Sequence, residues 1–215
     1  MLNLTPPELI SRVLILIIAF TIHEFAHAWT ANHFGDSTPA MNGRLTLNPL
    51  AHLDILGSLM LLFAGFGWAK PVPVNPYAIQ KNSSSGLMWV SIAGPLSNFI
   101  MAALAAIPLR FNLVPDLPSG TIFPSLYTFL FEFIFINLTL MLFNLLPIAP
   151  LDGDAVAEYF FPPSMNRVLG KIRPFGPYLL LAVVFLGPTL GFDVLGWVLN
   201  QPRIDLFRIL IGVYA

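Results

Sequence analysis

The chain contains no cysteine among its 215 residues, so disulfide bonds are excluded and any bound metal ion must take nitrogen or oxygen ligands. Charge is also scarce. Only 10% of residues are charged, against roughly 25% in soluble domains, and the net charge of −1 excludes the basic surface that nucleic-acid binding requires. Hydrophobic residues make up 56% of the chain and mean hydropathy is +0.77, a composition that indicates a membrane protein.

Four apolar segments approach or exceed the roughly 20 residues that cross a bilayer. They cover roughly residues 9–33, 86–109, 122–147 and 177–199, the last interrupted by Gly187-Pro188. A shorter run, Ile55–Phe66, is typical of a buried re-entrant segment. We therefore expect an all-α polytopic membrane protein. We expect a bundle of about four to five transmembrane helices that forms a single domain over residues 1–215, with the catalytic core at about residues 9–160.

An H-E-x-x-H motif lies inside the first apolar segment, at His23-Glu24-Phe25-Ala26-His27. On a helix, residues four apart share a face, so His23 and His27 can bind one metal ion. Glu24 lies close enough to activate a water molecule there. Because the segment carries these residues and lacks a small-residue cleavage site, we expect it to be kept as a membrane anchor rather than removed as a signal peptide. The motif predicts zinc-dependent hydrolysis of a substrate that lies in the bilayer.

A catalytic zinc ion usually has three protein ligands and one open position, so a third ligand is needed. His33 has the spacing of the last histidine in H-E-x-x-H-x-x-G-x-x-H. In that motif, glycine lets the chain turn back to the metal, but here the position is Thr30. If the helix continues, His33 lies about 9 Å beyond His27 and on another face. We therefore reject His33 as a ligand.

Asp152 is the better candidate for the third ligand. It follows a long apolar segment whose end is unwound by Pro147 and Pro150. A carboxylate at membrane depth is costly without a counter-charge, and a metal ion supplies one. The alternative interpretation of Asp152 is the N-cap of the next helix. Spacing alone also leaves three loop residues open as ligands: His52, Asp54 and Asp36.

Three segments together resemble the site-2 protease family of intramembrane zinc metalloproteases. They are His23–His27 on one apolar segment, Ala93–Asn98 (A-G-P-L-S-N) on another, and Asn144–Gly153 after a third. Asn48–Asp54 and Gly67–Pro76 also resemble segments of the compact bacterial and archaeal members, so the match runs from about residue 15 to 160 in the right order. The length leaves no room for the PDZ or CBS module that some relatives carry.

The resemblance implies three ligands for one zinc ion per chain: His23, His27 and Asp152. It also implies that Glu24 is the general base and that Asn98 and Asn144 orient the substrate backbone or stabilise the oxyanion. The implied substrate is a transmembrane segment of another membrane protein, cut in regulated intramembrane proteolysis.

Two stretches near the motif predict short strands. Met41–Leu47 has a turn signal followed by alternation. Gly67–Pro76 carries prolines at alternate positions, which leave the edge at Val72 and Val74 free to pair, with a rigid surface loop as the alternative. A transmembrane substrate must unwind before its backbone is accessible, and this edge is a candidate for holding it as an added strand. We therefore expect a short β-hairpin or strand region near the active site.

The predicted ligands constrain the topology. If Asp152 meets the histidines, the first and third long helices run parallel, so the 86–109 segment makes the one crossing between them and Ile55–Phe66 makes none. Six basic residues fall at the proposed site's end: Arg44, Lys70, Lys81, Arg167, Lys171 and Arg173. Arg12 and Arg110 fall at the other. By the positive-inside rule, the zinc lies toward the cytoplasmic face of a bacterial or archaeal cell membrane.

Other functions can use the same residues. A membrane zinc carrier or sensor needs the ligands but has no use for a glutamate beside His23, which makes Glu24 the discriminating residue. An inactive homologue that serves as a scaffold is disfavoured because every expected catalytic residue is present. Glu132 lies in a phenylalanine-rich apolar segment, where an ionisable residue is by default a functional candidate. We favour for it a hydrogen bond to a neighbouring helix or contact with water near the outer surface.

Overall fold

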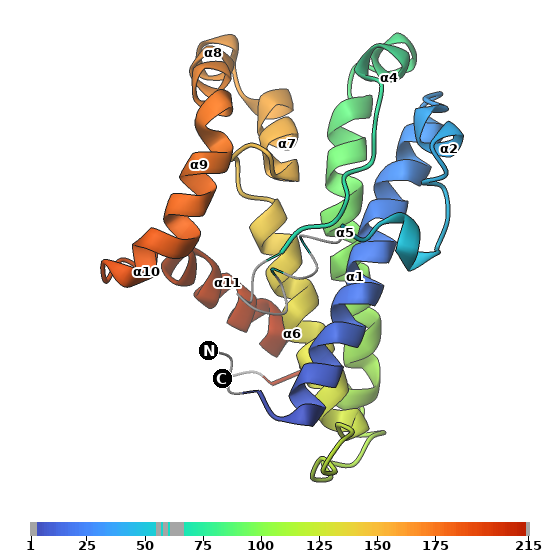
Figure 1. Cartoon of the computed structure of the whole chain (residues 1–215), viewed down its shortest axis with the longest axis vertical. Helices are drawn as coiled ribbons and strands as arrows, with labels where there is room; N and C mark the ends of the chain where they lie inside the picture. Colours follow the sequence, from blue (N-terminus) through green and yellow to red (C-terminus); the bar gives the residue numbers. More distant parts are fainter. Residues whose placement is uncertain (1–3, 55–56, 58–59, 61–66, 214–215) are drawn as a thin grey trace.

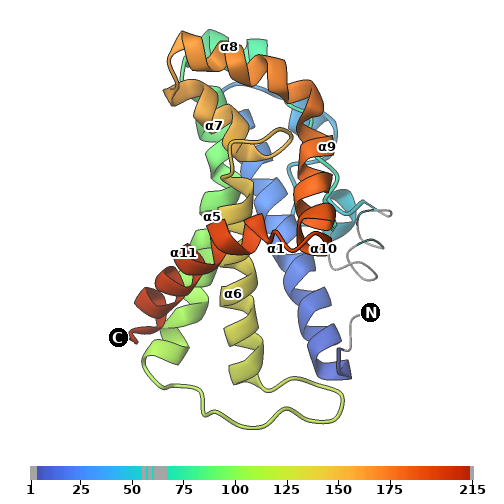
Figure 2. The ribbon, with the colours of Figure 1, turned by 90° about the vertical axis from the view of Figure 1, so that its left-hand side faces the viewer.

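A computed structural model describes residues 4–54, 57, 60 and 67–213. Three long helices organise this part of the chain: α1 (Pro6–His33), α5 (Gly86–Arg110) and α6 (Leu126–Asn144). α1 and α6 run in the same direction and α5 runs antiparallel to both (Figures 1 and 2). The parallel course predicted for the first and third long helices is therefore confirmed.

The long helices begin at residues suited to cap them and pack through small side chains. At the start of α1, Glu8 accepts a hydrogen bond from the backbone N–H of Thr5 (2.8 Å). At the start of α6, Ser125 Oγ accepts one from the backbone N–H of Thr128 (3.1 Å). Each bond satisfies a backbone N–H group at a helix start. Ala102 and Ala106 of α5 are buried. Small residues let neighbouring helix backbones approach closely, so the helices associate through van der Waals packing.

Shorter elements complete the described chain. They are α2 (Thr38–Met41), η1 (Pro49–Ala51), α4 (Pro76–Asn82), α7 (Asp152–Phe160), α8 (Pro163–Ile172), η2 (Arg173–Phe175), α9 (Gly176–Leu181), η3 (Ala182–Leu186), α10 (Gly187–Thr189) and α11 (Val194–Ile211). α2, α4, α7 and α8 gather at the upper end of the molecule in Figure 1, and the connection between α5 and α6 forms the lower end.

In the part of the chain that the structure describes, four helices are long and apolar enough to cross a membrane: Pro6–His33, Gly86–Arg110, Leu126–Asn144 and Pro163–Leu186. The first three confirm the predicted spans. The fourth differs from the predicted segment 177–199, because the helical run ends at the Gly187–Thr189 turn and a new helix begins at Val194. Asp193 fixes that start, since its side chain accepts a hydrogen bond from the N–H of Gly196 (2.8 Å). The prediction of one span across this break was wrong.

The last helix, α11, lies across α5 and α6 in the lower half of the bundle (Figure 2). Phe207 is its buried anchor and belongs to the same core cluster as Ala102 and Leu138. Arg110, at the end of α5, donates to the backbone oxygen of Ile209 (2.9 Å). The C-terminal segment from Gln201 is helical and contributes to the core through Phe207.

The described residues contain no strand, and the strand predicted at Met41–Leu47 was wrong. The backbone N–H groups of Asn42, Gly43 and Arg44 donate to Thr38, Ala40 and Pro39, at 3.1, 3.0 and 2.8 Å. These bonds continue the end of α2 as a turn, which Gly43 can follow because it adopts φ +67°. Local helix-end hydrogen bonds therefore replace the alternating strand pattern.

Gly67–Pro76 forms no regular strand before α4 begins at Pro76, and no neighbouring strand pairs with it in the described part of the chain. An isolated antiparallel bridge joins Leu53 to Ala69. The β-hairpin is therefore not confirmed. Most of Ile55–Phe66 lies outside the described residues, so its re-entrant course stays a prediction.

We predict that single cysteines report one crossing by α5. Because the chain has no cysteine, Asn42→Cys and Lys81→Cys should react with an impermeant maleimide from one side of the membrane, and Asp116→Cys from the other. The reason is that α1 ends and α5 begins at the same end of the bundle (Figure 1). Labelling of positions 81 and 116 from the same side would contradict this topology.

Candidate metal centre

The two motif histidines lie one turn apart on α1 with their Nε2 atoms 3.0 Å from each other. Nδ1 of His23 lies 2.6 Å from Oδ1 of Asn98, and Nδ1 of His27 lies 2.7 Å from the backbone oxygen of Val90. Both partners accept hydrogen bonds, so each Nδ1 carries a proton and each Nε2 is left with its lone pair. Two lone pairs that face each other at this distance repel unless a cation lies beside them.

Asp152 supplies a carboxylate to the same point. Its Oδ2 lies 3.2 Å from Nε2 of His23 and its Oδ1 lies 3.3 Å from Nε2 of His27. Asp152 is the first residue of α7 and Leu151 is the N-cap, so the alternative N-cap interpretation of Asp152 is wrong.

These three side chains offer donor atoms that all lie within 4.8 Å of one another. Two imidazole nitrogens and one carboxylate oxygen are a donor set that catalytic zinc sites use. Oδ2 of Asp152 is buried and has no hydrogen-bond partner in the described chain, so it too is available to a metal ion. The group therefore fits one zinc ion.

Gly94 on α5 makes room for this group. A Cβ atom at position 94 would overlap Nε2 of His27 and lie 2.6 Å from Nε2 of His23. Only glycine leaves the space in front of the two nitrogens open. Gly94 of α5 therefore contributes to the metal centre by leaving space for the two imidazoles.

Glu24 is buried and lies beside the irregular segment between residue 67 and α4. Its Oε2 accepts a hydrogen bond from the backbone N–H of Val72 (3.2 Å). The structure therefore places Val72 beside Glu24, while the role of Val72 and Val74 at the substrate stays a prediction.

The other predicted site residues lie as follows. Asn98 is fully buried against His23, and its Nδ2 donates to Oδ1 of Asn137 (2.9 Å). Asn144 is half-buried at the end of α6 and donates to the backbone oxygen of Leu140 (3.0 Å). The roles predicted for Asn98 and Asn144 at the substrate stay predictions.

The four alternative ligands are placed elsewhere. His33 stacks on Trp29 at the end of α1, with ring centroids 5.9 Å apart. The three loop candidates bond to other groups: His52 to Thr46 O (2.7 Å), Asp54 to Gly57 N (2.8 Å) and Asp36 to Asn75 N (2.6 Å). Of all the described histidines and carboxylates, only His23, His27 and Asp152 form a group that could hold a metal ion.

Sequence reasoning missed Asn137 and Gly94. Asn137 is fully buried in α6, where its neighbours are Phe135, Ile136 and Leu138. A signal for it was present, because an amide inside an apolar span is costly unless it is hydrogen-bonded. Gly94 lies within the Ala93–Asn98 motif, but the need for a missing Cβ there appears only when α5 is placed against α1.

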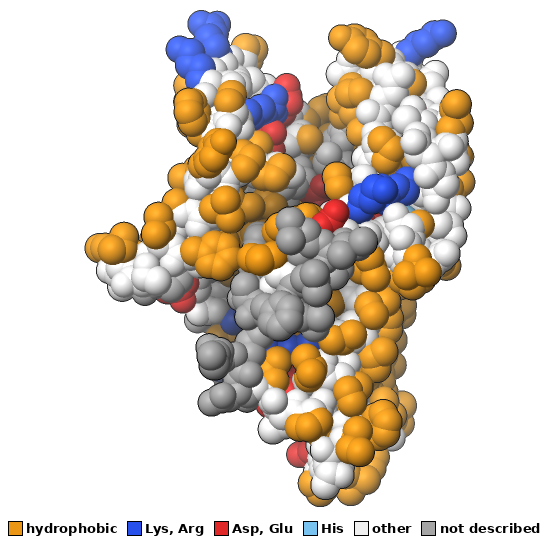
Figure 3. Space-filling model, viewed as in Figure 1, with side chains coloured by type: hydrophobic (Ala, Val, Ile, Leu, Met, Phe, Trp, Pro, Cys, Tyr) orange, Lys and Arg blue, Asp and Glu red, His pale blue; other side chains and the backbone are white. Residues whose placement is uncertain are grey.

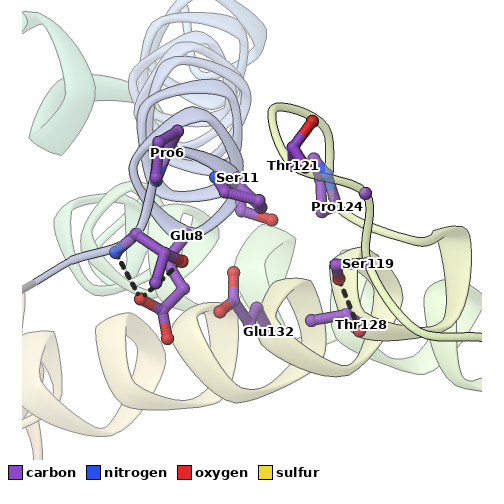
Figure 4. A pocket seen from close by; sticks show the side chains of 11 residues that line it. Pro6, Glu8, Ser11, Ser119, Thr121, Pro124, Thr128 and Glu132 are labelled. Carbon is purple, nitrogen blue, oxygen red and sulfur yellow. Dashed lines mark hydrogen bonds between the residues drawn. The ribbon is translucent and has the colours of Figure 1, made fainter.

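Glu132 does not belong to the metal centre. It lines a cavity of about 490 Å³ between the beginnings of α1 and α6, together with Glu8, Ser11 and Ser119 (Figure 4). Within the described ranges its Oε2 has no hydrogen-bond partner, so the predicted bond to a neighbouring helix is not confirmed for that atom. The cavity lies at the opposite end of the bundle from α4 and α8.

Comparison with known proteins decides the family. Over 203 residues the chain is 40% identical to the Bacillus subtilis protein named "Putative zinc metalloprotease YwhC", covering 94% of this chain and 91% of that one. The chain belongs to the site-2 protease family. It is also 33% identical over 190 residues to "Putative zinc metalloprotease Rip2" of Mycobacterium tuberculosis, covering 86% of this chain and 71% of the relative. The protein of the same name in Mycolicibacterium smegmatis is 30% identical over 211 residues, covering 93% and 79%.

No family model and no solved structure matches the chain. The relatives named above are sufficient to assign the family, because each alignment covers most of this chain and most of the relative. This site-2 protease family member is a zinc metalloprotease, and the group of two histidines and one aspartate can hold its one zinc ion. The predicted enzyme class and cofactor are confirmed.

We predict that Gly94→Ala weakens zinc binding by at least about tenfold, because the added methyl group pushes both imidazoles out of the ligand position. The measurement is zinc competition against a chelator with the purified protein. Gly170→Ala in α8 is the matched control, since a Cβ there meets nothing within 4 Å. Equal zinc affinity in the two variants would show that the space at Gly94 is not needed by the metal.

Proposed function

We propose that the protein is an intramembrane endopeptidase that cuts a transmembrane segment of another membrane protein. The observation that carries this proposal is the depth of the metal centre within an apolar helix. His23 and His27 lie ten and six residues before the end of α1, which is about 15 and 9 Å at 1.5 Å per residue. α1 is long and apolar enough to span the bilayer, so a substrate must reach this depth to be cut.

His23, His27 and Asp152 hold the zinc ion. When bound, zinc supplies a Lewis acid that polarises the scissile carbonyl and acidifies a water molecule. Glu24 is the general base: its carboxylate takes the proton from the attacking water and delivers it to the leaving nitrogen. Glu24 is one residue after His23 on the helix, about 100° around the axis, so it borders the metal without binding it.

The edge at Val72 and Val74 holds the substrate. A transmembrane helix hides its backbone in internal hydrogen bonds, so the segment to be cut must unwind and find other partners. Pairing with an existing extended segment supplies them. The hydrogen bond between Val72 N–H and Glu24 supports this role, because it places the edge beside the proposed base. Asn144, at the end of α6, is our candidate for orienting the substrate backbone.

We also propose that the metal centre faces the cytoplasm. Lysine and arginine side chains gather at the upper end of the molecule, over α8 and α4 (Figure 3). By the positive-inside rule this end is cytoplasmic and the N-terminus lies outside. The bacterial relatives fit a location in the cell membrane.

We predict that Glu24→Gln lowers cleavage of a single-span substrate by about 10²- to 10⁴-fold and leaves zinc bound, because glutamine keeps the size but cannot take the proton. Cleavage is measured with purified protein and a panel of single-span substrates, and zinc by metal analysis. Glu132→Gln is the matched control, a second glutamate on a spanning helix that is distant from the site. Near wild-type cleavage by Glu24→Gln would favour a zinc carrier or sensor, which needs no base.

We predict that Val74→Pro raises the KM for a transmembrane substrate by about 3- to 10-fold, because it removes one backbone donor from the proposed edge. Val74→Ala keeps the donor and should retain the wild-type KM. Steady-state kinetics of the two variants on the same substrate make the comparison. Identical KM values would exclude pairing of the substrate at this position.

A further inference from the structure

We propose that Asn137 is a positioning residue for the metal centre. Acting through Asn98, it fixes which ring nitrogen of His23 carries the proton. The inference rests on the proposed role of His23 as a zinc ligand and deepens it. Asn137 lies on α6, a helix that supplies none of the three ligands, and its side chain hydrogen-bonds to Asn98 and to the backbone of its own helix.

The chain of hydrogen bonds starts from a backbone atom whose chemistry is fixed. The carbonyl oxygen of Phe133 can only accept, so Asn137 must turn its Nδ2 toward it (2.9 Å). Oδ1 of Asn137 then faces the other way and accepts from Nδ2 of Asn98 (2.9 Å). That bond leaves Oδ1 of Asn98 to accept from Nδ1 of His23 (2.6 Å). Each group in the series determines the orientation of the next.

Burial makes this orientation obligatory. Asn98 and Asn137 have no exposed surface, so neither amide can exchange a protein partner for bulk water. If the amide of Asn98 turned over, its Nδ2 would face Nδ1 of His23, and that nitrogen would have to accept. The proton of the imidazole would then lie on Nε2, the atom that faces Asp152 and His27. An Nε2 that carries a proton has no lone pair for a metal ion.

His27 provides an internal comparison. Its Nδ1 bonds directly to a backbone oxygen, that of Val90, at 2.7 Å. A backbone carbonyl cannot turn over, so His27 is oriented without help from another side chain. His23 has only a side-chain amide as its partner, and an amide offers both a donor and an acceptor. The relay through Asn98 and Asn137 therefore serves one of the two histidines.

The test compares zinc affinities of purified variants, measured by chelator competition without any substrate. Asn137→Thr keeps a side chain that can donate to the helix carbonyl, as Thr139 does to Phe135 O (2.8 Å), but it is too short to reach Asn98. We expect it to fold and to bind zinc about 10- to 100-fold more weakly. Thr139→Val, two residues further along the same helix, is the control and should bind zinc like the wild type.

Two further variants separate orientation from packing. In Asn137→Asp, a neutral carboxyl group can donate to Phe133 O and accept from Asn98, so zinc affinity should be retained. Adding Asn98→Asp to Asn137→Thr should restore affinity, because a carboxylate presents an acceptor to His23 in either orientation. Any one of three results would refute the relay. Asn137→Thr could bind zinc as tightly as the wild type, or Asn137→Asp could lose as much zinc affinity as Asn137→Thr. The double variant could also fail to regain the zinc affinity that Asn137→Thr loses. A protein that passes these tests but cuts no transmembrane segment would refute the proposed function and leave the relay standing.

Discussion

The structure depends on one close contact: the Nε2 atoms of His23 and His27, two side chains of the apolar helix α1, lie 3.0 Å apart. Such a pair is stable only with a cation, and the surrounding helices are arranged to meet that need. α5 contributes the backbone oxygen of Val90 and the open space at Gly94, and α7 begins with the carboxylate of Asp152. The antiparallel course of α5 between two parallel helices brings these groups to one depth.

Buried polar side chains beside the centre bond to one another. His23, Asn98 and Asn137 form one buried series that ends on a backbone oxygen. In a low-dielectric interior, such a series fixes geometry because each alternative leaves a polar group without a partner. Glu24 is the exception, since its recorded partner is the N–H of Val72, on a segment outside the helices. The base therefore lies where an unwound substrate can approach.

The sequence was sufficient for the motif and three of the four spans, because these depend on helical spacing and on long apolar runs. It favoured Asp152 as the third ligand, but spacing left His52, Asp54 and Asp36 open, and the structure brings only Asp152 to the two histidines within the described residues. It failed at Met41–Leu47, where local hydrogen bonds to Thr38 and Pro39 extend a helix end. It also failed at the fourth span, where the break at Gly187 starts a new direction. Asn137 was missed for a different reason, since spacing within α6 does not show which face meets α5.

X-ray absorption at the zinc edge of the purified protein tests the central claim most directly. The account predicts about one zinc per chain, bound by two imidazoles at about 2.0–2.1 Å and by carboxylate or water oxygen at about 2.0–2.2 Å. The imidazole contribution should fall to one ring in His23→Ala. A spectrum without the two imidazoles, or one unchanged by that substitution, would contradict a zinc ion held between His23 and His27.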